Sequence, residues 1–335
     1  MTKIDIFSGF LGAGKTTLIK KLITEAYAGE KLVLIENEFG EIGIDGGFLS
    51  EAGIQINEMN SGCICCSLVG DFGKALSRVL TEYAPDRILI EPSGVGKLSD
   101  VIRAVQGAAT EGAVLNGFTT VVDAGKCKMY MKNFGEFFND QVENAGCIIL
   151  SHTDTTAPAK IETAVSLLRE HNPTAVIVTT PWNDLTGAQL LEAMERTDTL
   201  ECELARLAEE AHEHEHHHHN HDEECCCGHH HDHEHSHHHA DEVFVSCGTE
   251  TTQTFDRTAM ADKLNALTNE ETYGIVLRAK GIVAATDGGN WIHFDYVPGE
   301  PDVREGGAAV IGRLCIIGAN LNIPALSELF GVELG

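Results

Sequence analysis

The sequence has few positive charges: 23 Lys and Arg residues stand against 51 Asp and Glu, and the formal net charge is −28 over 335 residues. Nucleic acids and anionic lipid surfaces are themselves negative, so this deficit argues against either as a partner. The first residues contain neither a basic stretch nor a long apolar span of the kind that directs proteins to membranes. We therefore expect a soluble, cytoplasmic protein without a membrane or nucleic-acid partner.

Cysteine, in contrast, is plentiful. The chain has eleven Cys residues and no secretory signal, which indicates reduced thiols used for metal or redox chemistry rather than disulfides. The length favours more than one domain. We predict a first domain over 1–200, a linker over 201–241 and a second domain over 242–335.

Short apolar segments alternate with amphipathic ones through the first domain. The helix-like segments include Thr17–Tyr27 and 158–170, and the expected strands are Ile4–Phe7, Leu32–Ile35, Ile54–Ile56, Arg87–Ile90, Phe118–Val122, Cys147–Leu150 and Ala175–Val178. This alternation predicts an α/β fold, a mostly parallel sheet with helices on both faces. Ligands of such sheets gather at the carboxyl ends of the strands.

The segment GFLGAGKTT follows the first expected strand and begins the first expected helix. In that context G-x-x-x-x-G-K-[ST] is a phosphate-binding loop (P-loop), whose backbone N–H groups and helix N-terminus face anionic oxygens. Lys15 would reach the β- and γ-phosphates, and the Thr16 hydroxyl would complete the coordination of Mg²⁺. An ordinary glycine turn is the alternative. The residues predicted to bind nucleotide here are Gly9, Gly12, Ala13, Gly14, Lys15, Thr16 and Thr17.

Two later strand ends carry carboxylates that suit the same site. Glu91 would hold Mg²⁺, and Gly94 can donate its N–H to the γ-phosphate. Asp154 lies where a residue that reads the base should lie, and a carboxylate there accepts from guanine. The usual Asn-Lys-x-Asp is replaced by Ser-His-Thr-Asp, so His152 would lie against the purine and the choice between GTP and ATP stays open. Asp154 as a helix cap is the alternative.

A Cys-x-Cys-Cys motif lies between an expected strand and an expected helix. Cys63, Cys65 and Cys66 provide three thiolates, soft ligands that favour Zn²⁺ or Cu(I). A tetrahedral Zn²⁺ site requires a further ligand, and Glu36 or Glu41 from the neighbouring strand end is the candidate. Buried structural cysteines are the alternative.

The run from His212 to His239 consists mainly of His, Asp, Glu and Cys and has almost no apolar residues, so we expect it to be disordered without ligand. Neutral imidazoles bind Zn²⁺, Ni²⁺, Co²⁺ and Cu²⁺, and several modest sites would suit storage or delivery of metal. The run is internal, interrupted and mixed with acidic residues and Cys, which excludes an expression tag, and a merely solvated acidic linker is the alternative. The predicted ligands are His212, His214, His216, His217, His218, His219, Cys225, Cys226 and Cys227.

The last hundred residues are globular again in pattern, with alternating strand-like segments and two helix-like segments, Arg257–Leu267 and Pro324–Phe330. The expected strands are Val243–Val245, Gly274–Leu277, Gly281–Ala284, Trp291–Tyr296 and Gly312–Ile317. Antiparallel strands with helices on one face predict a smaller α+β domain. His293 fits a strand residue better than a metal ligand.

Together, the segments GFLGAGKTT, ENEFGE, NSGCICCS and EPSG, in this order, resemble the CobW family of P-loop GTPases. That family includes cobalamin-synthesis proteins, nitrile hydratase activators and zinc-transfer GTPases, and VLRAKG near residue 276 resembles its C-terminal domain. The resemblance implies a metallochaperone in which the nucleotide state controls a metal held by the Cys motif. It also implies that the C-terminal domain recognises the client that receives the metal.

The sequence therefore predicts a slow GTPase that uses GTP and Mg²⁺ and carries Zn²⁺, or else Co²⁺ or Ni²⁺, to a client metalloprotein; the chain could also form a homo-oligomer. Lys15, Thr16 and Glu91 are the expected catalytic residues. Hydrolysis should be slow because no Arg in these motifs is placed as a finger. Two alternatives remain at this point: a P-loop kinase or ATPase acting on a small molecule, and a passive metal-storage protein.

Overall fold

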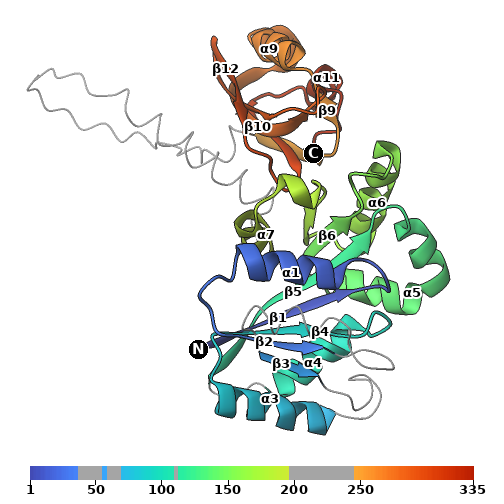
Figure 1. Ribbon diagram of the computed structural model, residues 1–335. Coiled ribbons are helices and arrows are strands. Elements are labelled where there is room, and N and C mark those ends of the chain that lie inside the picture. Colours follow the sequence, from blue (N-terminus) through green and yellow to red (C-terminus); the bar gives the residue numbers. More distant parts are fainter. Residues whose placement is uncertain (37–54, 59–68, 109–111, 196–244) are drawn as a thin grey trace, which may run out of the picture. The chain divides into compact units, whose positions relative to one another are not determined.

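The computed structural model of the protein describes residues 1–36, 55–58, 69–108, 112–195 and 245–335 (Figure 1). The chain divides into two compact units, Met1–Thr197 and Asp198–Gly335. Among the helices of the described ranges, none has the length and apolar character needed to cross a bilayer.

The first unit is built on a seven-stranded sheet of order β3-β2-β4-β1-β5-β6-β7. Every neighbouring pair in it is parallel, so the predicted α/β class is confirmed. The strands are β1 (Thr2–Gly9), β2 (Leu32–Glu36), β3 (Gln55–Glu58), β4 (Arg87–Glu91), β5 (Ala113–Asp123), β6 (Cys147–Ser151) and β7 (Val176–Val178).

Helices cover both faces of this sheet (Figure 1). Helices α1 (Lys15–Glu25) and α7 (Gly187–Glu195) pack together on one face. The other face carries α3 (Val69–Tyr83), α4 (Leu98–Ala108), α5 (Cys127–Glu143) and α6 (Pro158–His171), each packed against the next. A short 3₁₀ helix, η1 (Trp182–Asp184), follows β7.

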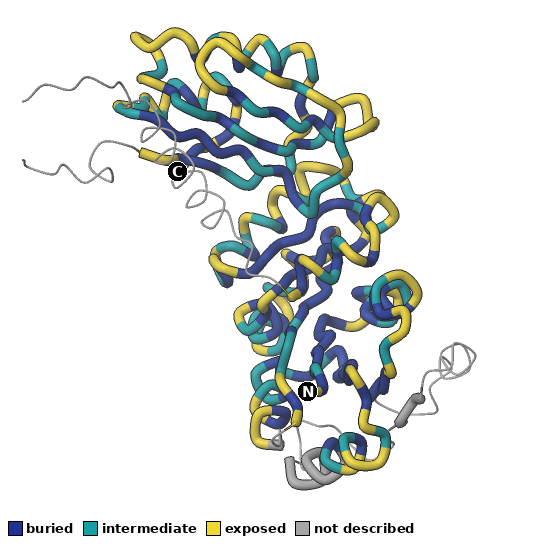
Figure 2. The backbone as a smooth tube through the Cα atoms, turned by 90° about the vertical axis from the view of Figure 1, so that its left-hand side faces the viewer, coloured by how far each residue is buried: buried dark blue, intermediate teal, exposed yellow. Residues whose placement is uncertain are grey.

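The strand sequences explain this two-sided burial. Alternate residues of β1 point to opposite faces: Ile4 and Ile6 join the core under α3 to α6, while Phe7 is equally buried on the face of α1. Figure 2 shows the central strands as buried backbone. Strands β2 and β6, with the sequences LVLIE and CIILS, are nearly continuous apolar runs, and runs of this kind are why the sequence located the strands of this unit.

The second unit contains a mainly antiparallel sheet of order β12-β11-β10-β13-β8, with β9 (Thr254–Phe255) paired to β10. Its other strands are β8 (Val245–Thr251), β10 (Ile275–Ala285), β11 (Trp291–Val297), β12 (Glu300–Gly306) and β13 (Gly312–Ala319). Its helices are α9 (Arg257–Ala266), α10 (Glu270–Tyr273) and α11 (Ile323–Phe330), and Met260, Leu264, Leu326 and Phe330 bury their side chains in one core with the sheet. The predicted α+β class is confirmed.

Several details of the second unit differ from the expectation. Strand β8 covers Val245–Thr251, whereas the predicted strand was Val243–Val245, whose first two residues lie outside the described residues, and β9 and α10 were not predicted. The two strands predicted around residues 274–277 and 281–284 are one strand, β10, because Ala279 and Lys280 continue the pairing with both neighbours. Strand β12 was missed because its sequence, EPDVREG, is charged and contains Pro, which is typical of an edge strand and resembles a loop. His293 lies in β11 as predicted, and its Nε2 is 2.8 Å from the Gly307 carbonyl oxygen.

Candidate nucleotide-binding site

The loop between β1 and α1 has the backbone that a phosphate cradle requires. Gly9, Gly12 and Gly14 have φ values of 142°, 70° and 100°, a region that L-residues with a side chain rarely adopt. At Gly9 a Cβ atom would also lie 2.4 Å from the Val121 carbonyl oxygen. The glycines of the motif are therefore required by the fold of this loop, and α1 begins directly after it with its N-terminus at the loop.

The two charged or polar side chains at the start of α1 already have partners at this edge of the sheet. The Lys15 Nζ donates to the Gly9 carbonyl oxygen at 3.0 Å. The Thr16 hydroxyl donates to the Glu91 carboxylate, with Oγ1 at 3.1 and 3.3 Å from its two oxygens. Glu91 is the last residue of β4, which lies next to β1. The fold thus brings together the three residues that the sequence assigned to catalysis.

A hydroxyl and a carboxylate in contact beside a P-loop form the set of hard oxygen donors that Mg²⁺ prefers. Thr16 and Glu91 therefore fit the ion that would accompany a bound nucleoside triphosphate. Mg²⁺ would supply charge neutralisation of the β- and γ-phosphate oxygens.

The loop after Glu91 lies against the P-loop. A Cβ atom at Gly94 would be 2.8 Å from the Leu11 backbone nitrogen, so only glycine allows this approach. Helix α5 also holds this loop. The Gln141 Nε2 on α5 donates to the carbonyl oxygens of Gly94 at 3.1 Å and Gly96 at 2.8 Å. Sequence reasoning did not find Gln141.

A cavity of about 250 Å³ opens beside Gly14 at the ends of β6 and β7. Its lining comes from the start of α1, the loop after β6 and the loop after β7, namely Gly14, Thr17, Ser151, His152, Thr153, Asp154, Pro181, Trp182 and Asn183. The predicted base-reading pair, His152 and Asp154, is among these residues. The His152 backbone has a φ of 56°, and its carbonyl accepts from the Thr155 and Thr156 amides, which fixes the turn.

The loop after β7 was not predicted to contribute to the site. The Trp182 indole Nε1 donates to the Leu150 carbonyl at 2.9 Å, and its Cη2 lies 3.2 Å from a Cβ atom built on Gly14. The signal was available in the sequence, since the expected strand ending at Val178 places residues 179–183 at the same edge as the other motifs.

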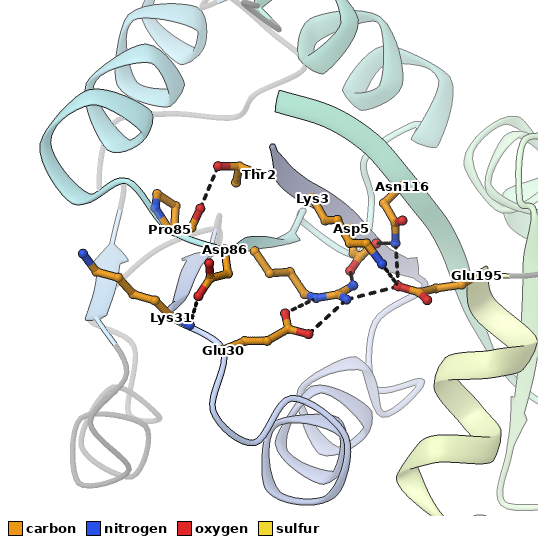
Figure 3. Close-up of polar contacts among 10 residues, drawn as sticks. Thr2, Lys3, Asp5, Glu30, Lys31, Pro85, Asp86, Asn116 and Glu195 are labelled. Carbon is orange, nitrogen blue, oxygen red and sulfur yellow. Dashed lines mark hydrogen bonds and ion pairs between the residues drawn. The ribbon is translucent and has the colours of Figure 1, made fainter. Parts of the chain in front are cut away.

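The opposite edge of the sheet carries a second polar cluster, shown in Figure 3. Arg87, the first residue of β4, pairs with Asp5 of β1, and its other nitrogens donate to Glu30 at 2.7 Å and Glu195 at 3.1 Å. Asn116 donates to Asp5 at 2.8 Å and to Glu195 at 3.0 Å. Burial raises the pKa of Asp5, against the opposing effects of Asn116 and Arg87. We assign this cluster to stability, because its members satisfy one another.

Most of the predicted metal ligands, namely Glu41, Cys63, Cys65, Cys66 and the residues from His212 to Cys227, lie outside the described residues. Glu36 is described: it ends β2 and is aligned with Glu91 of β4 and Glu58 of β3. Within the described ranges no group of three or more His, Cys, Asp or Glu residues is arranged to hold a metal ion.

Four cysteines are described, and all four are buried free thiols: Cys127, Cys147, Cys247 and Cys315. Burial raises the pKa of the Cys127 and Cys147 thiols to about 12 in each case. At neutral pH they are protonated core residues and poor metal ligands.

A parallel sheet, a glycine loop leading into α1, and the pair Thr16–Glu91 define a P-loop nucleotide-binding protein. Residues 3–179 match the family CobW/HypB/UreG, nucleotide-binding domain, and residues 244–332 match the cobalamin synthesis protein cobW C-terminal domain. The chain belongs to the CobW/HypB/UreG family.

Several curated proteins are similar to the first part of the chain. "Zinc chaperone YeiR" of Escherichia coli is 33% identical over 159 residues, which cover 47% of this chain and 48% of that protein. "Zinc-regulated GTPase metalloprotein activator 1" of Schizosaccharomyces pombe is 26% identical over 217 residues, 61% of this chain and 53% of that protein. The chain thus spans about half the length of the curated relatives it matches.

Among solved structures, the Zn(II)-bound YjiA GTPase from E. coli aligns over 98% of both chains, with 21% identity and a TM-score of 0.44. A likeness at this level carries no argument about function.

Proposed function

We propose that this protein is a GTP-hydrolysing metallochaperone that binds Zn²⁺ at Cys63, Cys65 and Cys66 and transfers it to a client protein under control of the nucleotide. The observation that carries the nucleotide half is the contact of the Thr16 hydroxyl with the Glu91 carboxylate beside the P-loop. The proposed zinc binding and transfer rest on the Cys-x-Cys-Cys motif and on the similarity to proteins named as zinc chaperones.

In the hydrolysis step, the phosphates would replace the Gly9 carbonyl as the partner of Lys15, while Thr16 and Glu91 hold the divalent cation. The Gly94 N–H would face the γ-phosphate from the loop that touches Leu11. Most of the rate enhancement would come from charge stabilisation by these fixed groups. Intrinsic turnover would be slow, because the site motifs include no arginine placed to reach the γ-phosphate.

For the base, the cavity beside Gly14 suits a purine held between the loops after β6 and β7. Asp154 would accept from the N1 and exocyclic amine hydrogens of guanine, and adenine has no matching pair of donors. The Trp182 ring is a further surface available to the base, because flat aromatic groups stack favourably.

The metal half has support from topology. Strand β3 ends at Glu58, five positions before Cys63 in the sequence, and it is aligned with β2 and β4 at the carboxyl edge of the sheet. In the sequence, the Cys motif therefore follows a strand that ends at the same edge as Glu91 and the P-loop, and Glu36 ends β2, the strand between β3 and β4. Thiolates with one glutamate form a suitable ligand set for Zn²⁺, and Co²⁺ or Ni²⁺ are the alternatives.

The His-rich run would act as a store that raises the local metal concentration, and the C-terminal unit would recognise the client. Both assignments come from the sequence and the family. Deletion of 212–239 should lower the number of ions bound while leaving the tightest site and the hydrolysis rate intact.

The proposal is tested by purifying the full chain without a tag, measuring its metal by elemental analysis, and titrating it with GTP and ATP. We expect stoichiometric zinc, binding of GTP in preference to ATP, and slow release of inorganic phosphate. Transfer of the γ-phosphate to a small-molecule acceptor, with turnover indifferent to metal, would instead identify a kinase. Metal binding with no nucleotide binding would identify a passive store.

A further inference from the structure

Helix α5 holds the loop that follows Glu91 through several side chains. Gln141 donates to the carbonyl oxygens of Gly94 and Gly96, as described above. One residue earlier, Asp140 accepts from the backbone N–H of Ser99 at 3.0 Å and from its hydroxyl at 2.7 Å. The loop between β4 and α4 is therefore anchored to α5 at its middle and at its end.

The Gln141 side chain is fully buried, and its orientation is fixed by the partners it has. Its amide nitrogen faces two carbonyl oxygens, so exchanging the amide oxygen and nitrogen would place an acceptor against two acceptors. Its Oε1 is buried without a hydrogen-bond partner. Leaving a buried acceptor unpaired is costly, and the contribution of this glutamine to the structure therefore comes through its amide hydrogens.

The two bonds orient peptide groups that lie next to the phosphate site. In a trans peptide the C=O and N–H point in opposite directions, and the described residues include no cis peptide bond. Fixing the Gly94 carbonyl toward Gln141 turns the Val95 N–H away from α5, and fixing the Gly96 carbonyl does the same for the Lys97 N–H. Because Gly94 also lies against Leu11, the two Gln141 bonds act on the part of the loop that borders the P-loop.

Helix α5 is in addition packed on the P-loop itself. The ring centroid of Phe10, in the loop, lies 4.6 Å from that of Tyr130 and 5.1 Å from that of Phe134. The helix thus contacts both parts of the chain that would surround a γ-phosphate, one through aromatic packing and the other through Gln141.

We propose that Gln141 is a positioning residue that holds the loop between β4 and α4 in the conformation required by the γ-phosphate. Resting on the proposed GTPase function, it supports binding and hydrolysis of GTP while contributing nothing to GDP, which has no γ-phosphate. The residue touches neither nucleotide nor metal and acts through the backbone of Gly94 and Gly96.

The chain provides a matched control in Asn172, at the end of α6. Its side chain is also buried and also donates to backbone carbonyl oxygens, those of Val142 at 2.8 Å and Ala145 at 2.9 Å. These carbonyls lie at the C-terminal end of α5, and the loop after Glu91 takes no part. Asn172→Leu removes buried donor bonds of the same kind, together with the bond that Asn172 Oδ1 accepts from the Ala175 N–H at 2.9 Å, and leaves the loop after Glu91 untouched.

The test compares the full chain with Gln141→Met, which keeps the size of the side chain and removes both donors, and with Asn172→Leu. Dissociation constants for GDP and for a non-hydrolysable GTP analogue are measured, together with kcat and KM for GTP, after melting curves show that each variant is folded. We expect Gln141→Met to lose about tenfold in affinity for the GTP analogue and to lower kcat, because two neutral hydrogen bonds are worth about one factor of ten. GDP affinity should be unchanged, and Asn172→Leu should lose stability with an unchanged ratio of GTP to GDP affinity.

Equal weakening of GTP and GDP in Gln141→Met, or no weakening, would overturn the proposal. If Gln141→Met is unfolded at the assay temperature, the same affinities are measured below its melting temperature, where the selective loss of GTP-analogue affinity should persist. If Gln141→Met leaves the ratio of GTP-analogue to GDP affinity unchanged while Lys15→Ala abolishes GTP hydrolysis, only the role of Gln141 is rejected. Retained hydrolysis in Lys15→Ala would reject the proposed function itself.

Discussion

The two edges of the parallel sheet both carry charged side chains, but they use them differently. At the amino edge, the side chains of Arg87 and Asp5 are each 2% exposed and pair with one another, and Glu30 and Glu195 complete the cluster. At the carboxyl edge, Lys15 is bonded to a backbone carbonyl and a cavity of about 250 Å³ lies beside the P-loop. Groups that satisfy one another stabilise a fold, whereas groups with replaceable partners next to a cavity can bind a ligand.

The largest effect should come from Lys15→Ala at the carboxyl edge. Removing the cation that meets the transferring phosphoryl group should lower GTP turnover by a factor of about 100–1,000 or more, because charge stabilisation supplies most of the catalysis. Phosphate release under saturating GTP measures this, and the melting temperature should change little.

Lys21→Ala is the matched control, since Lys21 lies on the same helix and pairs with Glu25 at 2.7 Å on the surface. It should leave turnover unchanged. Hydrolysis that survives in Lys15→Ala would remove the distinction between the two edges.

For Arg87→Met at the amino edge we expect the opposite result, a loss of stability with unchanged nucleotide affinity. This variant leaves the carboxylate of Asp5 buried without its cation, so the free energy of unfolding should fall by about 3–5 kcal/mol. Nucleotide affinity of the folded protein should not change, because Arg87 lies at the other end of β4 from Glu91.

Urea unfolding gives the stability, and a titration with a GTP analogue gives the affinity. The double variant Asp5→Leu with Arg87→Met should recover part of the stability, since it removes the unpaired charge as well. A large loss of nucleotide affinity in Arg87→Met would show that the amino-edge cluster also serves the site.

The carboxyl edge could be predicted from sequence because its signals are local. The P-loop follows a strand and precedes a helix within a few residues, and Glu91 ends an apolar run. Gln141 could not be found in this way: it acts on Gly94, 47 positions away, and as a glutamine in an amphipathic helix it resembles a surface residue. The pair Asp5–Arg87 could not be found from sequence either, because the two residues are 82 positions apart and meet only when β1 pairs with β4. Strand β12 was missed since edge strands avoid the apolar pattern.

A smaller effect, on selectivity, is expected from Asp154→Asn. The Asp154 carboxylate can accept from both the N1 and the amine hydrogens of guanine, whereas the Asn amide has one accepting oxygen and an NH₂ group that donates. GTP affinity should fall about 10–100-fold. The affinity for xanthosine triphosphate should rise, because its base has a carbonyl where guanine has the exocyclic amine.

Competition among GTP, ATP and xanthosine triphosphate provides the measurement. Asp184→Asn is the control, because Asp184 lies in η1 next to Asn183 but does not line the cavity. An equal loss of GTP and ATP affinity in Asp154→Asn would mean that this carboxylate does not read the base.

The smallest signal concerns the thiols. In the reduced, metal-free chain at pH 8, Cys127 and Cys147 should resist alkylation, because burial raises the pKa of each thiol to about 12 and leaves little thiolate. The thiols of Cys63, Cys65 and Cys66 should react first, and added Zn²⁺ should protect them. Mass spectrometry after a short exposure to iodoacetamide identifies the modified residues. Modification of Cys147 ahead of Cys65 would contradict this.

Under the proposed function, the nucleotide and the metal bind to one coupled edge of the sheet. If the γ-phosphate rearranges the loops near Glu36 and Glu91, the distances between metal ligands change, and metal affinity must differ between nucleotide states. The most direct test is a Zn²⁺ titration of the chain lacking 212–239, with a non-hydrolysable GTP analogue, with GDP and without nucleotide. We predict affinities that differ by about 5–150-fold between the GTP-analogue and GDP states, and loss of that difference in Cys65→Ser with nucleotide binding retained. Equal zinc affinities in all three states would overturn the proposed coupling and leave a metal binder beside an independent nucleotide site.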